Sequence, residues 1–324
     1  MPSKLAVVGS ANMDLVVRAP SIPRPGETLI GSSFAQFPGG KGANQAVAAA
    51  RLKPPLLAPK AEGEGVGGEG QTRTNPSQSE PTQTFFIGKT GNDNFGTSLR
   101  SSLEVAGVDT SYLSYTTNTT PTGIALITVA ESGQNSIVID QGANGELTAE
   151  EVKAALESIK PNVVLVQLEI PDGAVEACAG DHTLILDPAP ARYLDADFLR
   201  NVDVITPNET ETADLTGIMP MDEFSCRRAA EALLNQGIKN VVITLGERGI
   251  YWTEGKTDRF FDAPQVVAVD TTAAGDAFAG ALALFMCEGD DIQTAIEKAI
   301  KVASVSVTKH GAQASMPTRE EVRL

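Results

Sequence analysis

Short apolar runs alternate with helical patterns through the second half of the chain. Stretches with apolar residues at every third or fourth position separate short, mainly apolar runs at residues 163–168, 183–186, 202–206 and 241–245. Apolar runs of this length, without alternation, are typical of parallel strands buried on both faces. Two long helical patterns follow, at 276–287 and 292–308. The pattern therefore predicts an α/β fold with a mostly parallel sheet covered by helices.

Two other segments carry a different pattern. Residues 14–37 and 122–141 contain strand-like stretches interrupted by turns, which indicates a small antiparallel sheet. We expect this sheet to lie over the main one as a lid. A capping box at Thr148 and Glu151 predicts the start of a helix between the two patterns.

Residues 54–83 interrupt this organisation. The segment is rich in Pro, Gly, Glu, Ser and Thr and contains no aromatic residue. Because it has almost no apolar surface to bury, we predict a disordered insertion. A helical pattern at 42–52 precedes it and a strand at 85–87 follows it, so the insertion decorates one loop. The whole chain, 1–324, is predicted to be a single domain.

Composition and charge limit the classes of partner. Asp and Glu number 41 against 25 Lys and Arg, and the formal net charge of −16 repels nucleic acid and anionic membranes. The three cysteines and two histidines show no zinc-ligand spacing. There is no run of 18 apolar residues and no secretory leader pattern at the N-terminus. We expect a cytoplasmic protein, with a nuclear location left open, and neither nucleic acid nor membrane as a partner.

Polar side chains follow four consecutive predicted strands. Ligands of open α/β sheets bind beyond the carboxyl ends of the strands. Here those ends carry Glu169, Asp187, Asn208 with Glu211, and Thr244. A crevice lined by carboxylates, amides and hydroxyls suits a ligand that is rich in hydroxyl groups or carries phosphate.

The segment 270–276 immediately precedes an apolar helix and predicts an anion site. Its small residues leave the N–H groups of Ala273, Ala274, Gly275 and Asp276 unobstructed at the positive end of the helix dipole. The carboxylate of Asp276 could accept a proton from an attacking hydroxyl while those N–H groups stabilise a transferring phosphoryl group. The alternative is that Asp276 only caps the helix.

Two further glycine-rich segments flank predicted elements. Residues 39–45 open a helix and place Lys41 and Asn44 within one turn, without the spacing of a Walker A motif. The segment could equally be a tight turn that enters a helix. Residues 244–249 form a strand-then-glycine turn that would let a nucleotide approach the backbone, or a plain β-turn.

Taken together, these segments resemble the PfkB family of carbohydrate kinases. The likeness runs from residue 5 to 317, apart from the insertion, and rests on segments 9–14, 39–45, 90–96, 187–191, 206–211, 244–249, 270–276 and 311–313. It implies a Rossmann-like three-layer α/β/α core with a small β-sheet lid. The implied activity is the ATP-dependent transfer of a phosphoryl group to the 5-hydroxyl of D-ribose.

The resemblance also assigns residues to the sugar and to catalysis. Asp276 is implied as the base, and the N–H groups of Ala273, Ala274 and Gly275 as the anion hole. The sugar pocket is implied to comprise Asn12, Met13, Asp14, Gly39, Gly40, Lys41, Gly42, Asn44, Glu169 and Asp276. One departure is Ala273, where the family usually has glycine.

The same resemblance implies sites for ATP and for two cations. The nucleotide is expected at Asn208, Thr244, Leu245, Gly246, Glu247, Gly249, Gly275 and Ile300, where aliphatic Ile300 leaves the base preference open. Mg²⁺ is implied at Glu211 through water. K⁺ is implied at Asp270, Thr272, Ser306, Lys309, Gly311 and Ser315, mostly through carbonyl oxygens.

Several alternatives to a ribose-specific enzyme remain. The chain could be a family kinase that acts on fructose, deoxyribose or a nucleoside, or a sugar-binding regulator without catalysis. The pairing of Asp276 with an anion hole argues against a regulator, which needs no base. A dehydrogenase is disfavoured because no G-x-G-x-x-G motif follows the strand pattern at 5–8. Family members often pair through their lids, so a homodimer is expected.

Overall fold

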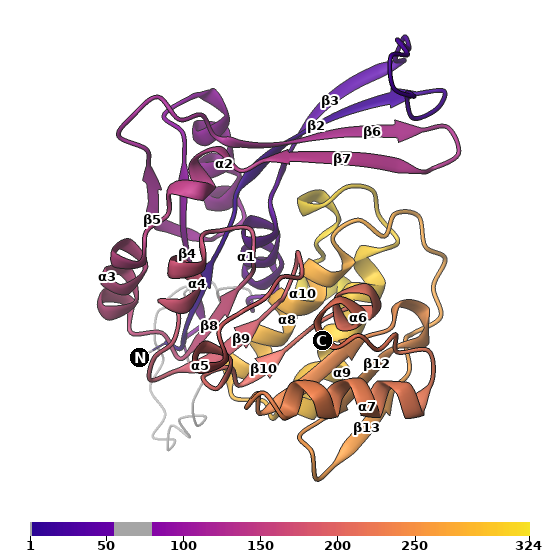
Figure 1. Ribbon diagram of the computed structural model, residues 1–324. Helices are drawn as coiled ribbons and strands as arrows, with labels where there is room; N and C mark the ends of the chain where they lie inside the picture. Colours follow the sequence, from indigo (N-terminus) through magenta and orange to yellow (C-terminus); the bar gives the residue numbers. More distant parts are fainter. Residues whose placement is uncertain (1, 55–79) are drawn as a thin grey trace, which may run out of the picture.

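A computed structural model describes residues 2–54 and 80–324, which are built around a nine-stranded sheet (Figure 1). Its order is β13 (Asp258–Phe261), β12 (Ile250–Thr253), β11 (Asn240–Thr244), β10 (Val204–Ile205), β9 (Thr183–Leu186), β8 (Val163–Val166), β1 (Lys4–Val8), β4 (Gln83–Thr90) and β5 (Asp109–Tyr115). All neighbours from β11 to β5 are parallel, and in this sheet β12 alone runs antiparallel to its two neighbours, β11 and β13. The predicted mostly parallel sheet is confirmed.

Helices cover both faces of this sheet. Alternate residues of β1 show the two layers, because Leu5 and Val7 pack into one buried cluster and Ala6 and Val8 into another. The first cluster includes α1 (Lys41–Arg51), α2 (Asn94–Val105), α8 (Ala274–Glu288), α9 (Ile292–Ser306) and α10 (Arg319–Val322). The second includes α3 (Ala149–Ile159), α4 (Asp172–Glu176), α5 (Ala196–Leu199), α6 (Glu209–Thr216) and α7 (Glu223–Leu234). The predicted three-layer α/β/α core is thereby confirmed.

A second, four-stranded sheet projects from the carboxyl edge of the main one (Figure 1). Its order is β3 (Ser33–Gly39), β2 (Asn12–Ala19), β6 (Gly123–Ala130) and β7 (Asn135–Asp140). The outer pairs are antiparallel, but β2 and β6 are parallel, so the prediction of an antiparallel sheet was wrong at its centre. The reason is topological, because β2 and β6 both continue from parallel strands of the main sheet, β1 and β5.

The insertion predicted over 54–83 falls mostly on residues 55–79, which lie outside the described residues. Its predicted end is too late. Gln83 already begins β4 and pairs with Lys4, and the preceding Thr82 is buried. Polar residues at the start of a strand give no apolar signal, which explains the misplaced boundary.

Helices α1 and α8 approach each other very closely at Gly280. A Cβ atom at this position would lie 2.4 Å from the carbonyl oxygen of Gln45 and 2.9 Å from the Cβ of Ala48. Only glycine allows this distance between the helices. The packing brings the first turns of both helices together at the carboxyl edge of the sheet.

In the part of the chain that the structure describes, no helix is long and apolar enough to span a membrane.

Candidate active site

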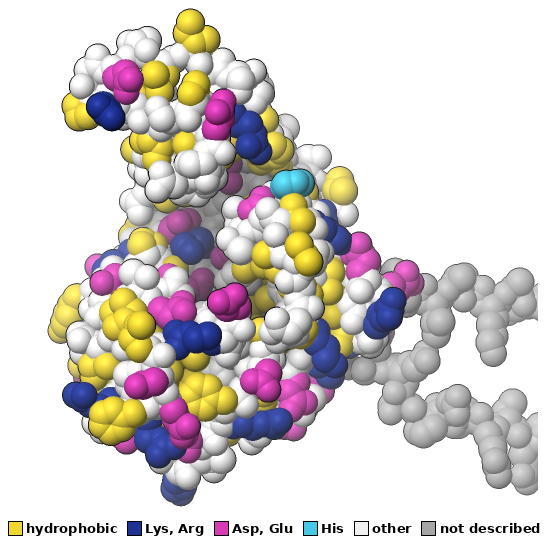
Figure 2. All heavy atoms as spheres, turned by 90° about the vertical axis from the view of Figure 1, so that its right-hand side faces the viewer, with side chains coloured by type: hydrophobic (Ala, Val, Ile, Leu, Met, Phe, Trp, Pro, Cys, Tyr) yellow, Lys and Arg dark blue, Asp and Glu magenta, His cyan; other side chains and the backbone are white. Residues whose placement is uncertain are grey.

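The polar strand ends meet at one edge of the main sheet, as predicted. Glu169, Asp187, Asn208 and Thr244 follow β8, β9, β10 and β11, which are consecutive parallel neighbours. Asn208 and Thr244 also form an isolated β-bridge. Figure 2 shows a deep hollow between the small sheet above and the main body below, with charged side chains along its floor. The site is therefore an open cleft between the two sheets.

Asp276 lies in the first turn of α8 and is only 6% exposed. The side-chain amide of Asn44 donates to its Oδ2 at 2.9 Å, and that of Gln45 donates to its Oδ1 at 3.1 Å. Burial raises the pKa of Asp276, while the nearby Lys41 ammonium and these two hydrogen bonds act in the opposite direction. The carboxylate is thus held at both oxygens by residues of α1.

Three of the four N–H groups of the predicted anion site are free at the start of α8. The backbone N–H groups of Ala273, Gly275 and Asp276 have no acceptor among the described residues. The N–H of Ala274 is not free, because it donates to the carbonyl of Thr271 at 3.2 Å. A Cβ added at Gly275 would meet no atom within 4 Å, so the space in front of this turn is open. Three backbone donors at this turn are therefore free to bind an anion.

Ala273 adopts the left-handed conformation, with φ 59° and ψ 18°. This conformation costs a residue with a Cβ about 1–2 kcal/mol. Ala273, where the family usually has glycine, thus keeps the backbone conformation that glycine favours, and this conformation is strained for alanine.

The glycine-rich segment before α1 brings the small sheet close to the main body. A Cβ at Gly39 would lie 2.3 Å from Oδ2 of Asp14, so the Asp14 carboxylate lies directly over this glycine. Gly40 has φ 88°, and a Cβ there would lie 2.6 Å from the backbone nitrogen of Asn12. These glycines are required where α1, Asn12 and Asp14 meet.

The cleft contains five acidic side chains around one lysine. They are Asp14, Glu169, Asp187, Glu211 and Asp276. Burial would lower the pKa of the Lys41 ammonium, but Asp276, Asp187, Glu169 and Glu211 together raise it above its usual range. The lysine therefore stays charged, and it stabilises a site that is otherwise strongly negative.

Two of these carboxyl groups titrate far from their ordinary range. Burial, followed by the charges of Glu169 and Asp276, raises the pKa of Asp14 to about 7. Burial also raises the pKa of Asp187 to about 7, with Lys41 acting against it and Asp276 and Glu211 adding to it. Burial likewise raises the pKa of Glu211. Without ligand, the cleft is thus a place where negative charge is costly.

Four further polar residues support the predicted ones. Ser10 donates a short hydrogen bond to Oε2 of Glu169. Asn144, in the 3₁₀ helix η1 (Gly142–Glu146), donates to Oδ1 of Asn12 at 2.7 Å and accepts from the N–H of Ala11 at 2.9 Å. The other two supporting residues are Gln45, described above, and Gln167, which donates to Oε1 of Gln45.

Sequence analysis gave no role to these four residues, although a signal existed for three. Ser10 and Gln45 belong to the segments 9–14 and 39–45, and Gln167 is a polar residue inside an apolar strand pattern. Asn144 had no such signal, because its partners lie 132 and 133 positions away.

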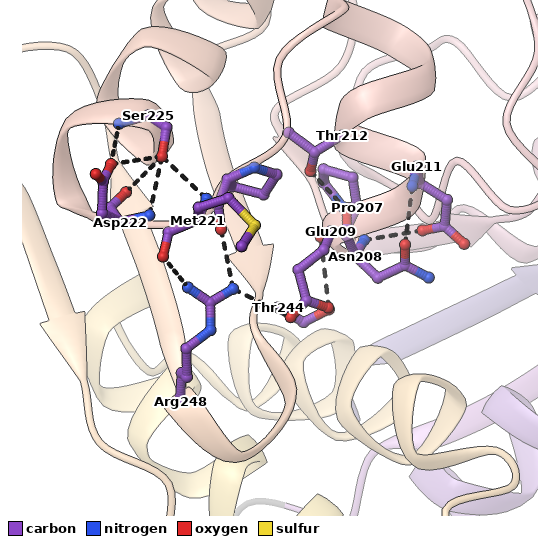
Figure 3. A network of polar contacts seen from close by, with 11 residues as sticks. Pro207, Asn208, Glu209, Glu211, Thr212, Met221, Asp222, Ser225, Thr244 and Arg248 are labelled. Atoms are coloured by element: carbon purple, nitrogen blue, oxygen red, sulfur yellow. Dashed lines mark hydrogen bonds and ion pairs between the residues drawn. The ribbon is translucent and has the colours of Figure 1, made fainter.

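Among the residues predicted for nucleotide and magnesium, Asn208 and Glu211 form a reciprocal cap at the start of α6 (Figure 3). Oδ1 of Asn208 accepts from the N–H of Glu211 at 2.8 Å, and Oε2 of Glu211 accepts from the N–H of Asn208 at 2.9 Å. Figure 3 also shows Arg248 reaching the carbonyl of Met221, a contact of 2.7 Å. This contact holds the 246–249 turn against the loop between α6 and α7.

The remaining predicted nucleotide residues fall into two groups. Gly246, with φ 57°, faces open space, and Glu247 is exposed. Leu245 and Ile300 are buried in the hydrophobic core, as is Met13 of the predicted sugar pocket.

Two of the predicted potassium residues, Thr272 and Gly311, bond the carboxylate of Asp270. Its Oδ1 accepts from the N–H of Thr272 and its Oδ2 from the N–H of Gly311, each at 2.9 Å. The carbonyl of Ser306 accepts from the N–H of Lys309, and the hydroxyl of Ser315, which is buried, bonds the carbonyl of Ala312. Within residues 2–54 and 80–324, no group of three or more His, Cys, Asp or Glu side chains is placed to hold a metal ion.

A parallel α/β sheet whose carboxyl edge carries a buried carboxylate beside free helix N–H groups suits the transfer of a phosphoryl group to a small hydroxylated molecule. Residues 2–319 match the family model described as pfkB family carbohydrate kinase. The chain belongs to this family, which confirms the resemblance seen in the sequence, and it is a phosphotransferase with an alcohol group as acceptor.

Curated relatives and solved structures are similar over nearly the whole chain. The ribokinase of Bacillus subtilis is 40% identical over 324 residues, covering 98% of this chain and 97% of its own. The deoxyribokinase of Salmonella typhi is 36% identical over 326 residues, covering 98% and 96%. The structure of Arabidopsis thaliana ribokinase complexed with ribose and ATP has a TM-score of 0.83 at 30% identity, covering 100% of this chain and 98% of that chain.

The raised pKa of Asp187 predicts an unusual pH dependence of stability. With a pKa of about 7 in the folded state and 3.8 as the ordinary value, the folded protein binds more protons than the unfolded chain between these limits. The free energy of unfolding therefore falls as pH rises from about 4 to about 7. Asp187→Asn should reduce the difference in this free energy between pH 5 and pH 8 by about 1–4 kcal/mol.

Urea unfolding of the ligand-free protein at both pH values measures this difference. The exposed Asp262→Asn serves as the control and should leave it unchanged. Carboxyl groups with lowered pKa values, such as Asp93 and Asp291, act below this window. If Asp187→Asn does not change the pH dependence of this free energy, the pKa of Asp187 in the folded protein is not raised, and the prediction is wrong.

Proposed function

We propose that this protein transfers the γ-phosphoryl group of ATP to the 5-hydroxyl of D-ribose, forming D-ribose 5-phosphate and ADP. The observation that carries the proposal is the buried carboxylate of Asp276 beside three free N–H groups at the start of α8. The likeness to relatives named ribokinase, and to a ribokinase complexed with ribose and ATP, supports the choice of substrates.

The polar groups of the cleft suit a sugar. Oδ1 of Asn44 is buried without a hydrogen-bond partner, so it is available to a hydroxyl donor. Oδ1 of Asn12 is occupied by Asn144, which leaves the Asn12 amide NH₂ as a donor. Asp14 and Glu169 add carboxylate acceptors. A sugar that lacks one hydroxyl leaves one of these groups unpaired, which disfavours it.

The opposite side of Asp276 suits the phosphates of ATP. The space in front of Gly275 and Gly246 is open, and because neither residue has a side chain, a phosphate chain can approach the backbone closely there. Asp276 accepts the proton of the sugar 5-hydroxyl while the oxygen of that hydroxyl bonds to the γ-phosphorus. At the same time, the bond from that phosphorus to the β,γ-bridging oxygen breaks. The N–H groups of Ala273, Gly275 and Asp276 stabilise the negative charge on the phosphoryl oxygens.

Glu211 fits the indirect magnesium role. Its Oε2 accepts the N–H of Asn208, and its Oε1 has no partner among the described residues, so Oε1 can hold a metal-bound water. Mg²⁺, when bound, neutralises charge on the phosphates. Within the described residues, the absence of a larger acidic metal cluster agrees with a metal that is held mainly by water and phosphate.

A monovalent cation fits the loops around Asp270. This carboxylate links the segment before α8 to Gly311 through two hydrogen bonds, and the other nearby donors are carbonyl and hydroxyl oxygens. Such a set carries little charge and suits K⁺ better than a divalent ion. K⁺ bound there would act on the anion hole by holding the 270–275 loop in place.

The small sheet is proposed to act as a lid within a single kinase domain. It carries Asn12 and Asp14 over the cleft, so its closure excludes water from the phosphoryl group. A cytoplasmic location is proposed because all three cysteines are buried free thiols, which suits a reducing compartment.

The lid is also proposed to form a homodimer with a second copy of the chain. Leu126 pairs with Val138 on one face of the sheet, and both are largely exposed, at 50% and 63%. Phe34 on β3, at the opposite edge of the same sheet, is 61% exposed. A thin sheet with this much exposed apolar surface is stabilised when a partner covers it.

Sedimentation velocity at micromolar concentration tests the dimer. The unchanged protein should sediment as a dimer, and Val138→Lys should shift it to a monomer, because a buried ammonium in the interface is costly. The control is Val105→Lys at the last residue of α2, an 86% exposed valine that is not part of the small sheet. A monomeric unchanged protein, or a dimer that persists in Val138→Lys, would contradict the proposal.

The choice of sugar is tested by a panel assayed with MgATP. A deoxyribokinase that is 36% identical makes 2-deoxyribose the most specific alternative, and fructose and adenosine represent the other family substrates. We expect kcat/KM for ribose to exceed that for each of them by about tenfold or more.

The same assays with K⁺ replaced by tetramethylammonium at equal ionic strength should give a lower kcat.

A preference for another sugar would overturn the substrate but not the reaction. Absence of ADP formation with every sugar, despite measurable ribose binding, would favour the non-catalytic regulator. Equal rates with and without K⁺ would remove the proposed potassium site.

The role of Asp276 is tested by Asp276→Asn, which keeps the shape and removes the base. We expect kcat to fall by about 10³-fold, within the usual range for general base catalysis. Ribose affinity, measured by calorimetry, should stay within about threefold. Asp262→Asn on the surface is the control. Near-normal turnover in Asp276→Asn would refute the assignment of the base.

A further inference from the structure

We propose that Gln45 is a positioning residue that links the catalytic carboxylate of Asp276 to the buried carboxyl group of Asp187. The proposal rests on the function proposed above, because it deepens the role of the same base. Asp187 is a buried acidic residue to which the reaction gives no part. Gln45 is its hydrogen-bond partner and connects it to the reaction centre.

One amide group serves both carboxyl groups. Nε2 of Gln45 donates to Oδ2 of Asp187 at 2.6 Å and to Oδ1 of Asp276 at 3.1 Å. An amide NH₂ has two hydrogens in fixed, coplanar directions, so both are used. All three side chains are buried, with Gln45 fully inaccessible. Water therefore cannot replace either hydrogen bond, and the position of one carboxyl group depends on the other.

The orientation of the Gln45 amide is set by Gln167. The Gln167 amide donates to Oε1 of Gln45, and Gln167 is itself inaccessible. A flipped Gln45 would place its oxygen against Asp187 and Asp276 and its NH₂ against the NH₂ of Gln167. This arrangement loses all three hydrogen bonds, so the amide is held in one orientation.

The two hydrogen bonds to Asp276 control its basicity. Asn44 holds Oδ2 at 2.9 Å and Gln45 holds Oδ1, and donors to both oxygens favour the ionised form that can accept a proton. Burial acts in the opposite direction. Loss of the Gln45 donor therefore raises the pKa of Asp276 and releases one of its oxygens from its position.

Asp187 adds a charge that responds to its surroundings. The charged groups that influence it are Lys41, Asp276 and Glu211, one cation and two acids. An ionised Asp187 repels the charge on Asp276 and makes it a stronger base, whereas a protonated one does not. Through Gln45, the same residue fixes where Asp276 lies.

Gln45→Met tests the positioning role, because methionine fills a similar volume without hydrogen bonds. We expect kcat for ribose to fall by about tenfold to a hundredfold and KM for ribose to change by less than about threefold. A titration of the Asp276 carboxyl carbon by ¹³C NMR should show a raised pKa without ligand or turnover. The matched control is Gln236→Met, at a half-buried glutamine just after α7. It should change neither kcat nor the pKa of Asp276.

A second variant tests the chain of contacts. Gln167→Met leaves Gln45 in place but removes the group that orients it, so it should lower kcat less than Gln45→Met does. In the Gln45→Met background, Gln167→Met should add almost nothing, since Gln167 acts only through Gln45. Additive losses would mean that the two glutamines act independently. If Gln45→Met fails to fold, as judged by circular dichroism, Gln167→Met and its effect on the Asp276 pKa decide the question.

The outcomes separate this inference from the proposed function. If ribose is not phosphorylated, the comparison is made with whichever panel sugar is the substrate, and without any substrate the pKa of Asp276 decides alone. If the unchanged protein phosphorylates ribose but Gln45→Met keeps kcat within about twofold or leaves the Asp276 pKa unchanged, the inference is overturned.

Discussion

Helices α1 and α8 lie in direct backbone contact at Gly280, and the geometry of the cleft depends on this contact. The two first turns meet only because no side chain separates the helices. Asn44 and Gln45 on α1 can therefore reach both oxygens of Asp276 on α8. If the two helices lay about one ångström further apart, both distances would exceed those of a hydrogen bond. The packing of two helices in the core thus sets the position of a single carboxylate.

The second constraint is the cost of negative charge. Five acidic side chains share one lysine in a partly buried cleft, and at least Asp14 and Asp187 are displaced to a pKa of about 7. A fold selected for stability alone would not concentrate acids in this way. In the proposed function, the same acids provide acceptors for sugar hydroxyls and a base. The strain of Ala273 at the start of α8 is a smaller cost of the same kind.

Features with a local signal could be predicted from the sequence. The capping box at Thr148 and the buried parallel strands follow from spacing and apolar runs, and the edge shared by Glu169, Asp187, Asn208 and Thr244 follows from parallel topology. Contacts between distant residues could not be predicted. Gln45 and Asp187 are 142 positions apart, and nothing in either segment specifies the other. The parallel pairing of β2 with β6 likewise depends on the path of the whole chain.

In the proposed function, the residues that contact the sugar are divided between the two sheets, and this division links binding to closure. Asn12 and Asp14 belong to β2 of the small sheet, whereas Asn44 and Asp276 belong to helices packed on the main sheet. On this proposal, a ribose held by both sets would connect the sheets, so part of its binding energy would be used to bring the lid over the cleft. A molecule that reaches only one set, such as water, cannot do this. Closure, and with it the exclusion of water from the phosphoryl group, then depends on the sugar that is to be phosphorylated.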